Sequence, residues 1–196
     1  MFNLSVPSFR SVSFDRRTMI SRAGRVTLSA AAIALLAGRD SLAAGKSSRA
    51  ESVEQDVSIL NTALGAELEA VAAYQVGAES GLLSKPVLGL AVQFQGHHKE
   101  HADALTATIK KLGTKAVVPK SKYDFPVETL KTEKDVLRFA AGLEKGAVSA
   151  YLGAVPILGD RELARVAASI LGDEAMHWAI LRQALGEVPV PGAFVS

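Results

Sequence analysis

Two pairs of potential metal ligands occur in this chain, and the members of each pair are three residues apart. His98 and His101 form the first pair, and Glu174 and His177 form the second. Residues three apart lie on the same face of a helix, so both members of a pair could bind one cation. The chain has no cysteine, which leaves carboxylate and imidazole as its strong ligands. Such ligands suit iron, manganese or zinc.

Both pairs follow a repeated stretch of sequence. Residues 63–74 and 140–151 share alanines, a glycine, a glutamate, a valine and a tyrosine at a constant offset. Each copy therefore supplies a glutamate, a tyrosine seven residues later and a two-ligand pair downstream, which indicates a metal site inside a helical bundle. The residues that the repeat adds to the candidate site are Glu67, Tyr74, Glu144 and Tyr151.

Apolar periodicity and helix-ending residues predict an all-α chain with four helices. The first and second helices are separated by a short break, as are the third and fourth, whereas residues 113–131 form a long connection without helical periodicity. This pattern predicts a four-helix bundle made of two helical hairpins and a long crossover. The expected helices span residues 51–83, 84–112, 132–158 and 160–186.

Specific residues mark the ends of these helices. Ser84 and Asp160 are expected to cap the second and fourth helices, and Thr132 with Asp135 resembles a capping box at the start of the third. Pro156 is expected to distort the last turn of the third helix, because proline lacks a backbone donor.

The helix lengths place the candidate ligands at one depth in the bundle. Glu67 lies about 16 residues before the first turn and the His98–His101 pair about 15 after it, and a rise of ~1.5 Å per residue brings both to the same level. Glu144 and the Glu174–His177 pair stand in the same relation to the second turn. We therefore expect one site built from all six residues, namely Glu67, His98, His101, Glu144, Glu174 and His177.

Residues 1–43 resemble a bacterial twin-arginine signal peptide. Arg16 and Arg17 precede a weakly hydrophobic run that is shorter than the ~20 apolar residues of a membrane span. Residues 41–43 then supply the small side chains that a signal peptidase reads. This predicts export by the twin-arginine machinery, cleavage near Ala43 and a periplasmic mature protein without a membrane span. A disordered, arginine-rich N-terminus is the alternative.

The remaining chain is expected to contain a flexible lead-in at residues 44–51, the bundle at 52–187 and an extended tail at 188–196. The whole chain has a net charge of +2, but residues 1–43 hold six arginines against two aspartates. Without them, 18 acidic and 16 basic residues remain. We therefore expect no basic face for nucleic acid.

Over about residues 52–186 the chain resembles the ferritin-like superfamily, in particular its exported bacterial members. In that family pattern the first and third helices each contribute a glutamate, and the second and fourth each contribute Glu-x-x-His. The residues Glu67, His101, Glu144, Glu174 and His177 match this pattern, whereas His98 stands where a glutamate is expected. The resemblance implies a carboxylate- and histidine-bound di-iron or manganese site that reacts with O2 or peroxide; zinc also suits the ligands.

His98 leaves the composition of the site open. A carboxylate can bridge two cations and cancel charge, whereas a neutral imidazole does neither. Two ions bridged by Glu174 remain compatible with the ligand set, as does a single ion bound mainly by Glu144, Glu174 and His177. His97 is a spare imidazole that a small rotation of the second helix could bring into the site.

Three functions follow from these alternatives. The first is a ferroxidase or peroxide-reacting oxidoreductase, and the second is metal capture without turnover. The third is a non-enzymatic exported bundle with a metal-free polar core and a role in stress or partner binding. The tail is too short for a fifth helix, so an iron-storage cage finds no support, and apolar residues around Trp178 are compatible with a homodimer.

The aromatic residues near the ligands are expected mainly to fill the core. Tyr74 and Tyr151 could in addition donate hydrogen bonds to the ligand carboxylates, as outer groups around metal sites commonly do. Phe94, Phe139 and Met176 are expected to pack between helices.

Overall fold

The computed structural model describes residues 49–195, which form four long helices and two short 3-10 turns without any strand. The prediction of an all-α chain is therefore confirmed for this part. The signal peptide expected at residues 1–43 and residues 44–48 of the expected lead-in lie outside the described residues, whereas residues 49–51 already belong to the first helix. The elements are α2 (Arg49–Glu79), α3 (Lys85–Lys111), η2 (Val127–Thr129), α4 (Glu133–Ala154), η3 (Val155–Ile157) and α5 (Arg161–Ala184).

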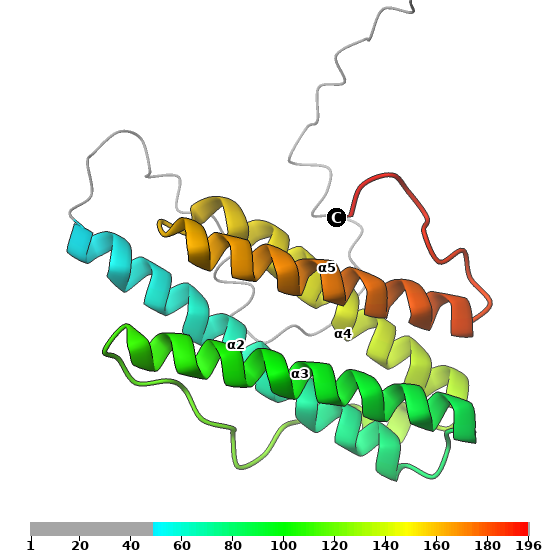
Figure 1. Ribbon diagram of the computed structural model, residues 1–196. Helices are drawn as coiled ribbons and strands as arrows, with labels where there is room; N and C mark the ends of the chain where they lie inside the picture. The colour runs from blue at the N-terminus through cyan, green and yellow to red at the C-terminus, as the bar shows by residue number, and fades with distance from the viewer. Residues whose placement is uncertain (1–48, 196) are drawn as a thin grey trace, which may run out of the picture.

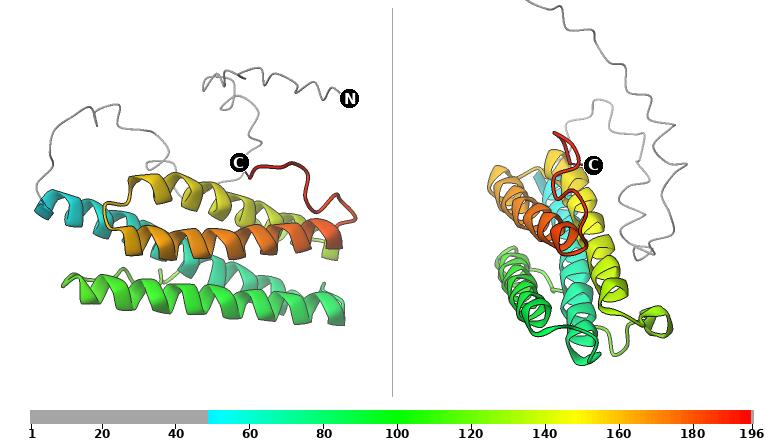
Figure 2. Two further views of the ribbon diagram at one scale, coloured as in Figure 1. Left: turned by 45° about the horizontal axis from the view of Figure 1, so that its top comes forward. Right: turned by 90° about the vertical axis from the view of Figure 1, so that its right-hand side faces the viewer.

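The helices form two antiparallel hairpins. Figure 1 shows α2 beside α3 in one hairpin and α4 beside α5 in the other. Residues 112–132 run along the bundle from the end of α3 to the start of α4, and the end-on view in Figure 2 shows the four helices around one axis. The predicted four-helix bundle with a long crossover is thus confirmed.

The caps of α4 and α5 are confirmed, and for α3 the predicted cap position is confirmed but the capping hydrogen bond is absent. Thr132 and Asp135 form a complete capping box at α4. At the start of α5, the side chain of Asp160 accepts hydrogen bonds from the backbone N–H groups of Glu162 at 2.7 Å and Leu163 at 3.1 Å. Ser84 occupies the N-cap position of α3 without a side-chain hydrogen bond. Its backbone N–H instead donates to the carboxylate of Glu133 on the other hairpin.

The first helix is shorter than expected, since α2 ends at Glu79 and not near residue 83. The Ser80 hydroxyl donates to the carbonyl of Gly77 at 2.7 Å, so it competes with the helical backbone bonds at this point. At the other end of the bundle, α4 stops at Ala154 and Pro156 lies in the 3-10 turn η3. That break confirms the distortion expected from this proline.

Two apolar layers enclose one polar layer along the bundle axis. The first layer is centred on Leu60, Leu64, Leu105 and Ile109, and the second on Phe94, Leu137 and Leu181. Tyr151 belongs to the first layer and Tyr74 to the second, which confirms their packing role. Between the layers lie the buried polar residues Glu67, His98, Glu144, Glu174 and His177.

Asp56 fastens the start of α2 to the turn between α4 and α5. Its side chain is 3% exposed and accepts hydrogen bonds from the backbone N–H groups of Gly159 at 2.7 Å and Asp160 at 3.0 Å. A β-carbon on Gly159 would collide with the hydroxyl oxygen of Ser52. The turn therefore approaches α2 closely, and the contact ties the two hairpins together.

The aromatic and methionine side chains divide between core and surface. Phe94 is buried, and Trp178 packs against the second apolar layer with Lys145 and Arg182 over its ring. Met176 is 57% exposed, so the expectation that it packs between helices is wrong. Of the helices between residues 49 and 195, none combines the length and the apolar character that crossing a membrane requires.

Candidate metal centre

The six predicted ligands meet in the polar layer, and every helix of the bundle contributes at least one of them. Five are almost fully buried, and the side chain of His101 is 15% exposed. Their depths agree because each glutamate and its downstream pair lie at similar distances from the intervening turn. The contributions are Glu67 from α2, His98 and His101 from α3, Glu144 from α4, and Glu174 and His177 from α5.

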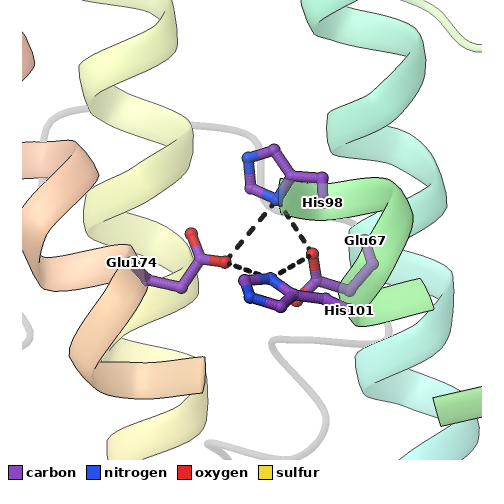
Figure 3. Close-up of side chains that lie close together, drawn as sticks. All are labelled: Glu67, His98, His101 and Glu174. Carbon is purple, nitrogen blue, oxygen red and sulfur yellow. Dashed lines mark hydrogen bonds and ion pairs between the residues drawn. The ribbon is translucent and has the colours of Figure 1, made fainter. Parts of the chain in front are cut away.

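Four of these residues form a first group between α2, α3 and α5. Figure 3 shows Glu67, His98, His101 and Glu174 with their polar atoms directed toward one another. Nδ1 of His98 lies 2.9 Å from Oε2 of Glu67, and Nδ1 of His101 lies 3.1 Å from Oε1 of Glu174. One donor atom from each residue lies within 4.8 Å of the others, so all four could contact one ion.

A second group lies next to the first, between α3, α4 and α5. It comprises His98, Glu144, Glu174 and His177, whose donor atoms also lie within 4.8 Å of one another. Nε2 of His98 is 3.3 Å from Oε1 of Glu144, and Nδ1 of His177 is 3.6 Å from Oε2 of Glu144. All four residues are buried, so this group is the more enclosed of the two.

Glu174 belongs to both groups, and its two oxygens face different ones. Oε1 lies 3.1 Å from Nδ1 of His101 and 3.5 Å from Nδ1 of His98, whereas Oε2 lies 3.7 Å from Nδ1 of His177. A carboxylate placed in this way can bind one cation through each oxygen.

His98 also belongs to both groups, although it departs from the family pattern. Its Nδ1 faces Glu67 on α2 and its Nε2 faces Glu144 on α4. The imidazole thus stands at the centre of the polar layer, and its two nitrogens serve opposite sides. The residue that departs from the family pattern is thus one of the most buried members of the site, at 1% exposure.

The two tyrosines of the repeat bond to the carboxylates of the opposite copy. The Tyr151 hydroxyl donates to Oε1 of Glu67 at 2.6 Å, and the Tyr74 hydroxyl donates to Oε1 of Glu144. Burial and the adjacent carboxylates raise the pKa of both phenols well above the usual value. Both hydroxyls therefore keep their protons and act as donors, in addition to filling the core.

Five buried polar atoms of the two groups have no hydrogen-bond partner among the described residues. Leaving such atoms unsatisfied in a protein core is costly. All five are nitrogens or oxygens that bind metal ions, and a cation in each group would satisfy them. The donor set therefore fits a metal centre. The atoms are Nδ1 of His101, Oε2 of Glu144, both carboxylate oxygens of Glu174 and Nδ1 of His177.

The carboxylates strongly favour positive charge on the histidines. Burial alone would lower the pKa of His98, but its hydrogen bonds to Glu144 and Glu67 outweigh burial and raise the pKa to about 11. Burial acts in the same direction on His101 and His177, and the surrounding glutamates raise the pKa of each to about 9. Without metal, protons on these imidazoles thus balance the buried negative charge.

The same contacts act in reverse on the carboxylates. Burial would raise the pKa of Glu67 and Glu144, yet the imidazoles around them lower the pKa of both groups below the usual value. Both carboxylates are therefore ionised near neutral pH, as metal ligands must be.

His97 and Asp173 form an outer extension of the centre. Nδ1 of His97 lies 2.9 Å from Nε2 of His177 and 3.2 Å from Oδ2 of Asp173. His97 therefore contacts the outer nitrogen of the candidate ligand His177. It does not face the buried carboxylates, as a replacement ligand would. Asp173 is not among the predicted ligands, although its i, i+4 spacing to His177 puts both residues on one helix face.

Phe94 fixes the plane of one candidate ligand. Its ring stacks on the imidazole of His177 with centroids 4.0 Å apart and planes 25° apart. Because Phe94 is itself 1% exposed, this contact also closes the second group on its apolar side.

Comparison with known proteins agrees with this architecture. A solved structure, that of a conserved hypothetical protein, rv2844, from Mycobacterium tuberculosis, superposes with a TM-score of 0.63 and 20% sequence identity. The match covers 75% of this chain and 99% of that one, and it bears on the fold alone. No curated protein matches the chain. The ferritin-like domain family matches residues 55–187, and the chain therefore belongs to the ferritin-like domain family.

Proposed function

We propose that this protein binds two transition-metal ions side by side in the polar layer and uses them in reactions with O2 or peroxide. The position of Glu174 carries the proposal, because each of its oxygens faces a separate group of four potential ligands. A bridging carboxylate between two such groups is the arrangement that holds a pair of ions at short distance.

Five of the six predicted ligands have a defined role in this proposal. Glu67 and His101 would hold the first ion, Glu144 and His177 would hold the second, and Glu174 would contribute one oxygen to each. When bound, the ions supply redox electrons and open coordination positions for the oxidant. The hydroxyls of the two repeat tyrosines fix the outer carboxylates, and the flanking apolar layers exclude bulk water.

The ligands favour iron or manganese, with zinc as a further candidate. Three carboxylates and three imidazoles are hard to intermediate donors, which these ions accept. Three carboxylates also balance most of the charge of two divalent ions, which favours a pair over a larger cluster.

Metal analysis of the full chain tests the proposal. The protein is loaded anaerobically with Fe(II) or Mn(II) and desalted, and its metal content is measured beside that of a Glu174→Ala, His177→Ala variant. We expect about two ions per wild-type chain, oxidation of bound Fe(II) by O2 or peroxide, and loss of both properties in the variant. Equal, substoichiometric metal in both proteins would contradict the proposal. Stoichiometric binding without oxidation would favour metal capture.

One observation favours a second function, a metal-free bundle with a structural or partner-binding role. His98 is hydrogen-bonded to Glu67 and Glu144 at once, so a protonated imidazole could replace the charge of a metal ion. The substitution His98→Glu separates the two functions. If the variant gains metal binding that the natural protein lacks, the metal-free function is correct. If the natural protein already binds two ions, it is not.

We also propose that the protein acts in the periplasm after export in a folded state. The paired Arg16 and Arg17 and the short hydrophobic run after them support this, since this type of leader resembles a twin-arginine signal. Cell fractionation of the wild type and of an Arg16→Lys, Arg17→Lys variant tests it. We expect the variant to remain in the cytoplasm, and equal periplasmic amounts would contradict this route.

A further inference from the structure

Asp173 gathers three imidazoles at the outer edge of the metal centre. Its Oδ2 lies 3.2 Å from Nδ1 of His97, 3.4 Å from Nε2 of His101 and 3.2 Å from Nε2 of His177. The side chains of His97 and Asp173 are 35% and 24% exposed, whereas that of the adjacent Glu174 is 0% exposed. On α5, the carboxylate of Asp173 thus faces the solvent side of the centre, and that of the next residue, Glu174, faces its interior.

We propose that His97, Asp173 and His177 form an outer station, a surface site that binds a divalent transition-metal ion from solvent before the ion passes to the buried centre. The proposal rests on the proposed function of that centre. The three donor atoms lie within 4.8 Å of one another, as those of the buried groups do.

The distances in the outer station match three ligands on one face of an octahedral ion. With metal–ligand bonds of about 2.1 Å, ligands at right angles are separated by about 3.0 Å. The observed separations are 2.9 Å between the two imidazole nitrogens and 3.2 Å from each nitrogen to Oδ2. Two imidazoles and one carboxylate leave the remaining positions to water, which suits an ion that arrives hydrated and must leave again.

His177 connects the outer station to the buried centre. Its Nε2 faces His97 and Asp173, whereas its Nδ1 faces Glu144 and Glu174. A neutral imidazole has only one free lone pair, so it binds an ion on one side at a time. An ion held at Nε2 leaves the imidazole proton on Nδ1, so transfer to the vacant second group requires that proton to move to Nε2 through solvent as Nδ1 takes the ion.

A second imidazole offers a parallel route. Nε2 of His101 lies 3.4 Å from Asp173, and its Nδ1 lies 3.1 Å from Oε1 of Glu174. An open hollow between α3 and α5 reaches this point, lined by His101, Asp173 and Met176 among others. The hollow therefore gives solvent access to His101 and to Asp173, the carboxylate of the outer station.

The competing explanation is that Asp173 only orients the buried ligands. A carboxylate that accepts the outer N–H of a metal-binding histidine commonly fixes the ring and strengthens binding. The two roles predict different measurements. If Asp173 orients the ligands, its loss lowers the equilibrium affinity for metal, whereas if it belongs to the outer station, its loss slows metal loading. His97 also distinguishes the two roles, because it faces away from the buried carboxylates and could bind an ion only at the outer station.

The test follows Co(II) loading of the full-length protein by stopped-flow absorbance and measures equilibrium affinity by competition with a chelator. The variants are His97→Ala and Asp173→Asn, and Asp103→Asn is the control because it removes the same charge from an exposed site on α3. We expect loading to slow about tenfold or more in both variants. The control should load at the wild-type rate, and the final stoichiometry should be the same in all four proteins.

The alternative outcomes distinguish the outer station from the buried centre. Wild-type loading rates in both variants, with normal final binding, would overturn the station and leave the proposed function intact. Weaker affinity at an unchanged loading rate would also overturn the station and assign Asp173 an orienting role. If the wild-type protein binds no Co(II), Fe(II) or Mn(II), the proposed function fails and the station fails with it.

Discussion

The hydroxyl of Tyr151 donates a 2.6 Å hydrogen bond to Oε1 of Glu67, although the two residues belong to different hairpins. Tyr74 and Glu144 repeat this contact in the opposite direction. Each copy of the repeat therefore holds the outer carboxylate of the other copy. The metal centre thus depends on both hairpins, and neither copy completes its own half.

Removing these hydroxyls should weaken metal binding without unfolding the protein. In Tyr151→Phe the Glu67 carboxylate loses a donor that orients it, so we expect the affinity for Mn(II) to fall about tenfold or more. Tyr74→Phe should act similarly through Glu144. Calorimetric titration measures the effect, and Tyr123→Phe, in the crossover, is the matched control. An affinity equal to that of the control would contradict a supporting role.

Neutralising Glu174 should have a larger effect than neutralising Glu67. Glu174→Gln weakens both groups, because each of its oxygens faces one of them. We expect Glu67→Gln to lose about one tightly bound ion and Glu174→Gln about two, as measured by elemental analysis after desalting. Glu100→Gln, an exposed change on α3, should retain the wild-type amount. Equal losses in the two buried variants would contradict a bridge at Glu174.

The metal-free and metal-loaded proteins should respond to pH in opposite directions. The folded-state pKa is raised to about 11 for His98 and to about 9 for His101 and His177. Their contribution to stability is therefore complete below the unfolded pKa of about 6.5 and is lost as pH rises through the folded values. We expect the chelated protein to become less stable from pH 6.5 to 9.

Bound metal reverses this trend, because its ligands must be deprotonated and higher pH favours binding. Urea unfolding with a chelator and with Mn(II), at several pH values, measures both slopes. The variant His98→Gln, which has no titrating group at this position, should show a shallower slope in chelator. A chelated wild type that gains stability over the same pH range would rule out protonated imidazoles as the balancing charge.

Removing the Asp56 carboxylate should destabilise the fold and spare the metal site. Asp56→Ala leaves the N–H groups of Gly159 and Asp160 without their acceptor, which we expect to lower the free energy of unfolding by about 1–3 kcal/mol. Chemical denaturation measures the change, and Asp103→Ala is an exposed control. Metal stoichiometry should stay at the wild-type value, since Asp56 contacts none of the candidate ligands. A neutral effect on stability would show that water replaces the carboxylate at this turn.

Much of the fold could be predicted from local patterns. The capping box at Thr132, the cap at Asp160 and the break at Pro156 depend on residues within a few positions of one another, and all three are confirmed. Ser84 lies at the predicted cap position of α3, but it makes no side-chain capping bond, and the bond of its backbone N–H to Glu133 on the other hairpin could not be predicted from local spacing. Met176 was predicted wrongly because its exposure depends on how far α5 is rotated toward its neighbours.

The sequence by itself determined which residues can share a helix face and at what depth they lie. Helical rise and periodicity are properties of the backbone, so the spacings of Glu67, Glu144 and the two ligand pairs were sufficient to place them in one layer. The tertiary structure decided which atoms meet: the exchange of tyrosines between hairpins, the two-sided position of His98, and the contact of His97 with Asp173. These contacts depend on the pairing and rotation of separate helices. A shift of a few ångströms between helices decides whether a side chain can bind at the site or lies beside it.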